Sequence, residues 1–428
     1  MKPSLVGMLV VGLLLRSSSP LCADGMLSVE QLGAAGDVAL RAHGPSSQGH
    51  FKLVFSRRAG GISSWYDLDR DPGEHHTLAG HGELPQAALL MHVLRPIGVR
   101  SGDALYSAPA ETITVLEAND VRVRLRLEGG YSTAEAAERF RPESPPRGLL
   151  KGPGGRDPET RFVTTYTIYP TGQLYVCHAV RRAATTVVVG QSEWVLATAP
   201  SSQFTAVGSV ALAQPGAPSD FLLHTGSGPP YSGDALLVPD RRALVVGSWQ
   251  ERFVVGPERR GATRSSLEVQ PPGSVIGAQG ARWCGLLQIE PDWMDRRYLA
   301  TAAAEAYQSP PLPRIEAGWG EVMRGREGDD NVDGFAEEEG CYLLRASPRG
   351  LQMKFDLSEL VLISPVFRIG EWQGPPPATV ILDGQELVRG RHFGAARGGV
   401  FALLVQLYRN LSGGTVELEL ATGEADRQ

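Results

Sequence analysis

The sequence predicts a mainly β protein, in which a large antiparallel β-sandwich is followed by a small C-terminal β-sandwich. Three observations favour this class. Residues 161–182 read as a long hairpin, and residues 121–128 alternate between apolar and charged side chains, as in a half-buried strand. The 51 Gly and 31 Pro among 428 residues predict many turns and short strands.

Composition excludes several classes of protein. A hydrophobic content of 42% and a charged content of 21% are ordinary for a globular chain and not for a disordered one. The formal net charge of −6, without a basic stripe, argues against a nucleic-acid partner. No nucleophile elbow, phosphate loop, dinucleotide fingerprint or zinc motif is present, which argues against a common hydrolase, kinase or dehydrogenase.

The N-terminal residues 1–23 predict a signal peptide. Lys2 is followed by an apolar run from Leu5 to Leu15, which is too short to span a bilayer comfortably, and Ala23 is a small residue at the cleavage position. Lipid attachment at Cys22 is disfavoured by the residues before it. No later segment is long and apolar enough to cross a membrane, so we expect a secreted or periplasmic protein.

The large domain is expected over residues 24–310. A short helix is predicted to start at Ser28, and strands are predicted over 51–55 and 62–68, with a strand or short helix over 87–95. The 121–128 strand should present a charged outer face. Residues 130–160 read as a long loop, with a short helix near 134–140.

The hairpin over residues 161–182 is the clearest element. Its two runs flank Tyr169-Pro170-Thr171-Gly172, in which Pro170 presets φ and Gly172 closes the turn. Further strands follow, and a helix capped by Asp292 is predicted to end near Gln308, before a run of prolines.

The small domain is expected over residues 311–428 and is read as a β-sandwich. Its predicted strands are separated by turn signals, among them Asp383-Gly384 and Gly413-Gly414, each of which predicts a hairpin.

Two segments carry a family resemblance. Gly60–Leu68 (GGISSWYDL) and Thr165–Val176 (TYTIYPTGQLYV) resemble strands of galactose-mutarotase-like supersandwich domains of secreted carbohydrate-active proteins, including polysaccharide lyases. The resemblance implies a β-supersandwich over about residues 51–290 and a glycan partner. It implies no catalytic residue, and the chain has no room for the α/α-toroid domain of the large lyases.

Four hairpin residues are the candidate catalytic groups of a lyase that cleaves a uronic-acid polysaccharide by β-elimination. Tyr175 would act as base or acid, Arg181 would neutralise the substrate carboxylate, and His178 would assist. Tyr166 lies near them in the hairpin and completes the candidate set. Alternation places His178 on the opposite strand face from Tyr175 and Arg181. The alternative interpretation is that these are packing residues and a solvated strand end.

A second candidate set would bind substrate. Trp65, Tyr66, His75 and His76 come from a strand and the polar loop after it, and His81 follows. Such a loop can also bind a transition metal, although the spacing matches no zinc signature, and the remaining alternative is an exposed loop without a ligand. The competing function for the whole chain is a non-catalytic glycan-binding or surface structural protein of the same fold.

An acidic segment predicts a calcium ion as cofactor. Its candidate ligands resemble a calcium loop at the first positions, with Gly334 permitting a sharp turn, but Gly340 stands where an EF-hand needs a glutamate. The alternative is a solvated acidic loop. The candidate ligands are Asp329, Asn331, Asp333, Glu337 and Glu339.

The mature chain is expected to keep three cysteines, Cys177, Cys284 and Cys341. An odd number leaves at least one thiol unpaired, and Cys177 reads as a small buried residue. Cys284 and Cys341 could bridge in an oxidising compartment, but three thiols allow three pairings. The sequence leaves the pairing open.

Overall fold

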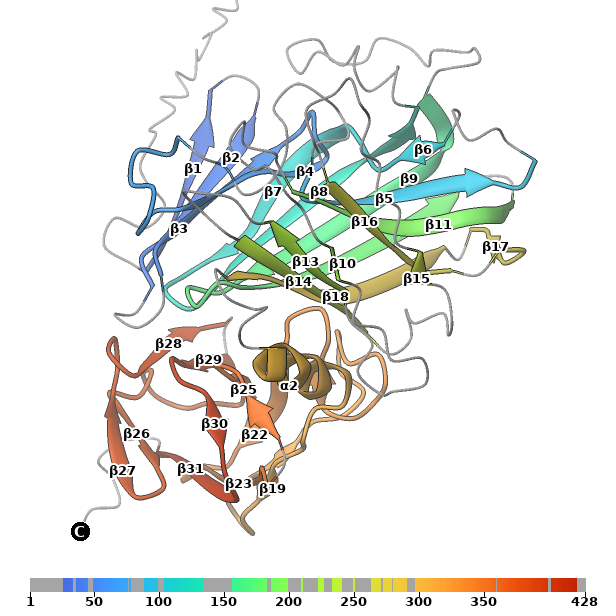
Figure 1. Ribbon diagram of the computed structural model, residues 1–428. Coiled ribbons are helices and arrows are strands. Elements are labelled where there is room, and N and C mark those ends of the chain that lie inside the picture. Colours follow the sequence, from blue (N-terminus) through green and yellow to red (C-terminus); the bar gives the residue numbers. More distant parts are fainter. Residues whose placement is uncertain are drawn as a thin grey trace, which may run out of the picture.

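The computed structural model describes most of the chain between residues 26 and 421 (Figure 1). The described residues are 26–33, 36–44, 49–75, 77, 88–98, 104–133, 156–182, 186–198, 209–210, 222–226, 233–240, 249–250, 263–270, 272–278, 280–290, 297–358, 360–398 and 402–421.

The N-terminal part is built from two antiparallel sheets. The first has the strand order β1-β2-β3-β4, and the second has the order β12-β13-β14-β18-β10-β9-β8-β6-β5-β11-β16-β15, with β7 beside β8 and β17 beside β11. The strands are β1 (Leu27–Leu32), β2 (Asp37–Ala42), β3 (Phe51–Ser56), β4 (Gly61–Asp67), β5 (Leu90–Pro96), β6 (Leu105–Tyr106), β7 (Ala110–Ala118), β8 (Val123–Ser132), β9 (Arg156–Ile168), β10 (Gln173–Arg182), β11 (Val187–Thr198), β12 (Ser209–Val210), β13 (Leu222–Gly226), β14 (Gly233–Pro239), β15 (Trp249–Gln250), β16 (Thr263–Glu268), β17 (Val275–Ile276) and β18 (Ala281–Glu290).

The two N-terminal sheets pack face to face through alternate apolar side chains. Leu53 and Phe55 of β3 are fully buried in the same cluster as Tyr166 of β9 and Val176 of β10. The Phe55 and Tyr166 rings meet edge to face, with centroids 5.1 Å apart. Burial of one face of each strand is what the period-two pattern of the sequence predicts.

The large sheet curves so far that strands distant in its order touch. A Cβ on Gly285 of β18 would lie 2.7 Å from the Trp194 ring of β11. The His92 ring of β5 stacks on Trp283 of β18, with centroids 4.9 Å apart. The curved sheet therefore encloses its own buried interior, as expected for a β-sandwich with a strong twist.

The helix α2 (Arg297–Gln308) follows the N-terminal sheets and contacts β14 and the later strand β24 (Val361–Leu362). In Figure 1 it lies between the large sheet and the C-terminal strands. Three sheets then follow, with orders β19-β23-β31-β26-β27, β20-β22-β25-β29-β28 with β21 beside β22, and β24-β30. Their strands are β19 (Arg314–Ile315), β20 (Gly320–Val322), β21 (Phe335–Ala336), β22 (Cys341–Ala346), β23 (Gly350–Asp356), β24 (Val361–Leu362), β25 (Val366–Gly370), β26 (Thr379–Leu382), β27 (Gln385–Val388), β28 (Phe393–Arg397), β29 (Ala402–Leu407), β30 (Leu411–Ser412) and β31 (Thr415–Ala421).

The central hairpin has the predicted form. The Gly172 N–H donates to the Tyr169 carbonyl at 3.0 Å, and Gly172 adopts a φ of 82°. Strands β9 and β10 then pair in register from Ile168–Leu174 to Thr160–Arg182.

The tip of this hairpin docks on the C-terminal part. The Tyr169 hydroxyl donates to the Glu339 carbonyl at 2.7 Å, and Gln173 Nε2 donates to the Ile363 carbonyl at 2.7 Å. One apolar cluster runs from Tyr175 through α2 into the C-terminal sheets. The predicted division of the chain at residues 310 and 311 falls between α2 and β19 and stays a prediction.

The mainly β class is confirmed, and two local predictions are corrected. The helix predicted at Ser28 is instead strand β1, because Leu27 and Val29 point into the sandwich core and pairing with β2 outweighs the local capping signal. Gly413 and Gly414 do not join a hairpin, since β30 pairs with β24 and β31 pairs with β23 and β26. The 383–384 hairpin between β26 and β27 is confirmed.

Several predictions fall outside the described residues. These are the signal peptide over residues 1–23, the short helix near 134–140, the Asp292 cap, and His76 and His81. Within the part of the chain that the structure describes, no helix is long and apolar enough to span a bilayer.

Candidate functional site

The four candidate catalytic residues do not meet in one cleft. Tyr166 and His178 point into the interior between the N-terminal sheets, where they are 1% and 3% exposed. Tyr175 points to the opposite face of β10, into the cluster shared with the C-terminal part. Arg181 lies at the exposed end of β10, six residues from Tyr175, which is roughly 20 Å along a strand.

His178 belongs to a buried hydrogen-bonded network. Its Nε2 lies 2.9 Å from the Tyr131 hydroxyl, and its Nδ1 lies 2.7 Å from Thr164 Oγ1. The Tyr131 hydroxyl also bonds His92 Nδ1, whose Nε2 lies 2.9 Å from Ser192 Oγ. Every polar atom named here therefore has a partner within the core.

Burial keeps both imidazoles of this network neutral. It lowers the pKa of His178 to about 3, and burial together with the neighbouring His178 holds the pKa of His92 well below its usual value. The adjoining cavity is about 10 Å³, which is at most one water molecule and no sugar ring. Sequence reasoning missed His92 and Tyr131, because strand pairing through β9 brings β8 to β10 and the curvature of the sheet brings β5 there.

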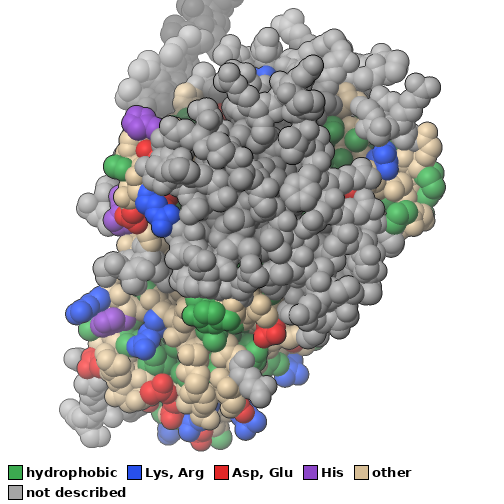
Figure 2. Space-filling model, viewed as in Figure 1, with side chains coloured by type: hydrophobic (Ala, Val, Ile, Leu, Met, Phe, Trp, Pro, Cys, Tyr) green, Lys and Arg blue, Asp and Glu red, His purple; other side chains and the backbone are tan. Residues whose placement is uncertain are grey.

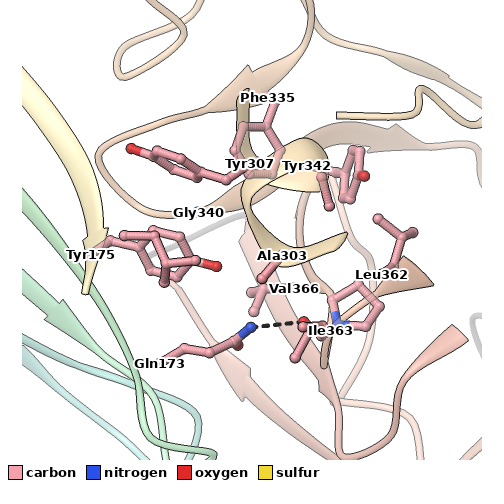
Figure 3. A pocket seen from close by; sticks show the side chains of 13 residues that line it. Gln173, Tyr175, Ala303, Tyr307, Phe335, Gly340, Tyr342, Leu362, Ile363 and Val366 are labelled. Carbon is pink, nitrogen blue, oxygen red and sulfur yellow. Dashed lines mark hydrogen bonds between the residues drawn. The ribbon is translucent and has the colours of Figure 1, made fainter. Parts of the chain in front are cut away.

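Tyr175 closes an apolar pocket at the junction with the C-terminal part. Figure 3 shows its ring beside Gly340, with Tyr307, Phe335 and Tyr342 around the same space. The space is about 40 Å³, and burial raises the pKa of Tyr175 far above its ordinary value. This tyrosine is a packing residue in the described structure.

The acidic loop, residues 328–340, covers Arg122, which directly precedes β8, and Arg124 within β8. Arg122 is 3% exposed and bonds the Glu339 carboxylate. Arg124 reaches Glu338 at 2.8 Å and Glu339 at 3.1 Å. The expected charged outer face is confirmed at Arg126 and Glu128, which stay accessible, whereas Arg122 and Arg124 are covered and use Glu339 as a counter-ion.

Asp329 organises the loop from within. Its Oδ2 accepts the N–H groups of Gly325 at 2.7 Å and Gly334 at 3.0 Å, and its Oδ1 accepts the Asp333 N–H at 3.0 Å. Asn331 Oδ1 also accepts the Asp333 N–H at 3.0 Å. These carboxylate and amide oxygens are used as turn acceptors, as expected for Asp and Asn in tight loops.

The remaining acidic groups line a cavity of about 290 Å³ beside the end of α2. Asp333 and Glu337 come from the loop, and Asp240 comes from the end of β14. Burial, and then the charges of Asp333 and Asp330, raise the pKa of Glu337 to about 7. The cavity thus gathers the ligand types that a hard cation prefers.

Next to this cavity, Asp240, Cys284 and Asp330 place one ligand atom each within 4.8 Å of one another. Asp330 is already bound by the Arg282 guanidinium at 2.6 Å. Calcium binding stays a prediction, and Asp333 and Glu337 are the predicted ligands best placed for it. Asp240 was missed, because residues 240 and 333 meet only in the folded chain.

The outer face of the β1–β4 sheet carries a polar row. Lys52 of β3 pairs in register with both Arg41 of β2 and Tyr66 of β4, so the three side chains stand side by side. The Lys52 ammonium lies 5.9 Å from the Tyr66 ring centroid. Lys52 and Arg41 both form ion pairs with the Glu74 carboxylate. We call these four residues the Tyr66 surface.

Two further predicted substrate-binding residues differ in their placement. Trp65 is 3% exposed and packs against Phe51 beneath the sheet, because adjacent residues of a strand point to opposite faces. Trp65 is therefore a core residue and offers no ring to a sugar. His75 is exposed in the loop after β4. Figure 2 shows basic, acidic and histidine side chains together along the left edge of this view.

Comparison with known proteins adds little. No family model matches the chain, and no curated protein matches it. Among solved structures, the crystal structure of HI1317 is similar with a TM-score of 0.31 and 10% identity, over 64% of this chain and 99% of that one. A candidate mutarotase, YeaD of Salmonella typhimurium, has a TM-score of 0.32 and 12% identity, over 62% and 94%. Likeness at this level carries no argument about the function of this chain.

Proposed function

We propose that the protein binds a polysaccharide or another glycan outside the cytoplasm, and that the Tyr66 surface is its binding site. The observation that carries the proposal is the row formed by Arg41, Lys52 and Tyr66 on a regular sheet. A tyrosine ring offers an apolar face and a hydroxyl to a sugar. Arg41 and Lys52 share the single Glu74 carboxylate, so the surface keeps one net positive charge, which favours acidic groups such as uronic acids.

The geometry favours binding over elimination. A lyase needs a base, an acid and a group that neutralises the substrate carboxylate within reach of one sugar. Among the described residues, Tyr175 and His178 lie on opposite faces of β10 and are buried, and Tyr166 of β9 is buried as well. The polysaccharide lyase activity therefore stays a prediction, as does secretion.

The test uses the chain from residue 24 and a panel of uronic-acid and neutral polysaccharides, with binding followed by titration calorimetry. We expect binding to acidic members, and a loss of about tenfold or more in Tyr66→Ala. The control is Tyr298→Ala, which removes a tyrosine that is 68% exposed on α2, away from this sheet.

Two outcomes would count against the proposal. If the folded protein binds no member of the panel, the proposal of glycan binding is wrong. If Tyr66→Ala binds with the same affinity as the wild type, the Tyr66 surface is not the binding site. Ultraviolet absorbance recorded on the same mixtures reports the conjugated double bond that elimination creates. A rising signal would establish the lyase and replace the binding function.

A further inference from the structure

Two cysteines lie opposite each other in the large sheet. Cys177 of β10 pairs in register with Cys284 of β18. The Cys284 N–H donates to Asp240 Oδ2 at 3.2 Å, and its carbonyl accepts the Asp240 N–H at 2.9 Å. Both backbone groups of Cys284 therefore point away from β10.

This direction defines the type of pair. In an antiparallel ladder, a residue whose backbone groups point away from a neighbouring strand forms a non-hydrogen-bonded pair with it, with Cα atoms about 4.5 Å apart. That separation lies inside the range of about 4.4–6.8 Å that disulfides require. Directly opposed residues also share one face of the sheet, so the two cysteine side chains are neighbours.

We propose that Cys177 and Cys284 form a cross-strand disulfide in the mature protein. Cys177 is 5% exposed and Cys284 is 0% exposed, so the bond forms while the sheet assembles and the thiols are accessible. The oxidant is a disulfide, such as oxidised glutathione or the disulfide of an oxidoreductase. The Cys177 thiolate attacks it and releases one donor thiol; the Cys284 thiolate then attacks the mixed disulfide and releases the second.

Cys341 is not a partner in this bond. It is 0% exposed on β22, and its Sγ lies 3.6 Å from a Glu339 carboxylate oxygen. It is buried in the apolar cluster that contains α2 and the C-terminal strands. The proposal therefore selects one of the three pairings that the sequence leaves open, and leaves Cys341 as a thiol.

The bond would reinforce the junction between the two parts of the chain. Arg282, two residues before Cys284, donates from Nε to Cys177 Sγ at 2.9 Å and reaches Asp330 and Glu338 at 2.6 Å. A covalent link between β10 and β18 would stabilise the part of the sheet that carries Arg282, and Arg282 binds the acidic loop. We expect the oxidised protein to melt about 5 °C above the reduced protein.

The test is peptide mapping of the chain from residue 24 after refolding with oxidised glutathione and alkylation of remaining thiols. We expect one cross-linked species that joins tryptic peptides 162–181 and 283–296, with peptide 327–345 alkylated at Cys341. Cys341→Ser should leave the cross-link unchanged. Recovery of Cys177 and Cys284 as alkylated peptides from natively folded protein, or a link from Cys341, would overturn the proposal.

Discussion

The ring of Tyr175 lies against the backbone of Gly340, so closely that a Cβ on Gly340 would be 1.9 Å from the ring carbon Cζ. Gly340 also has a φ of 62°, a region that favours glycine. The contact joins the central hairpin of the large sheet to the acidic loop. A residue chosen as a catalytic base from sequence is thus part of the packing between the two parts of the chain.

Replacing this glycine should destabilise the junction. Gly340→Ala places a methyl group inside the Tyr175 ring and strains the backbone, and we expect a loss of roughly 3 kcal/mol in the free energy of unfolding. Urea denaturation measures it. The matched control is Gly384→Ala, where φ is 76° but no atom lies within 4 Å of the added Cβ. Equal losses in both variants would show that the ring contact contributes nothing.

Stability should fall in acid through Glu339. Burial alone would raise its pKa, but Arg122, Arg124 and Arg368 outweigh that effect and lower the pKa to about 2. A depressed folded pKa stabilises the protein above the unfolded value of about 4.5, and this contribution, roughly 3 kcal/mol, is lost as the pH falls from about 5 to 2.

The measurement is the urea midpoint of the wild type and of Glu339→Gln across this range. The variant should be the weaker protein at pH 7, because it leaves Arg122 poorly compensated, and should show a flatter pH dependence. Glu321→Gln, at an exposed ion pair with Arg345, is the control and should follow the wild type. If the urea midpoints of all three proteins changed with pH in the same way, Glu339 would not be the group that lowers stability in acid.

Glu337 should act in the opposite direction. Its pKa is raised to about 7, so the folded protein holds a proton that the unfolded chain releases near pH 4.5, and stability falls as the pH rises from about 5 to 8. Glu337→Gln keeps the size of the side chain and removes this titration. We expect the variant to gain stability relative to the wild type at pH 8 and to match it at pH 4, as measured by thermal unfolding. A gain of the same size at both pH values would contradict this.

Calcium should reduce the repulsion between the Asp333 and Glu337 carboxylates in the cavity beside α2. If the ion binds Asp333 and Glu337, adding millimolar calcium raises the melting temperature, and the gain is larger at pH 8 than at pH 6, because Glu337 is ionised only at the higher value. Asp333→Asn should reduce the gain, whereas Asp120→Asn, in an exposed turn, should not. A melting temperature that neither calcium nor a chelator changes would show that the cavity binds no calcium ion.

Part of the fold could be predicted because it depends on local patterns. The Tyr169–Gly172 turn and the alternation along β10 define the central hairpin, and they also place Tyr175 and His178 on opposite faces. Asp383 and Gly384 define a second hairpin through their positive φ values. Turn chemistry and side-chain alternation act over a few residues, so the sequence carries them directly.

The site could not be predicted in the same way. Arg122 looks like an exposed strand residue until Glu339, 217 positions later, covers it. His92 and Tyr131 carry no local signal, because they meet His178 only when β8 and β5 join the same curved sheet.

The sequence by itself determined the β class, the principal hairpins and which residues share a strand face, because hydrogen bonding and burial impose a period of two on every strand. Only the tertiary structure decided which of those faces are buried, which charges are paired and which thiols are neighbours. These depend on contacts between segments far apart in the chain, and Cys177 meets Cys284 only because β10 and β18 are adjacent in the sheet.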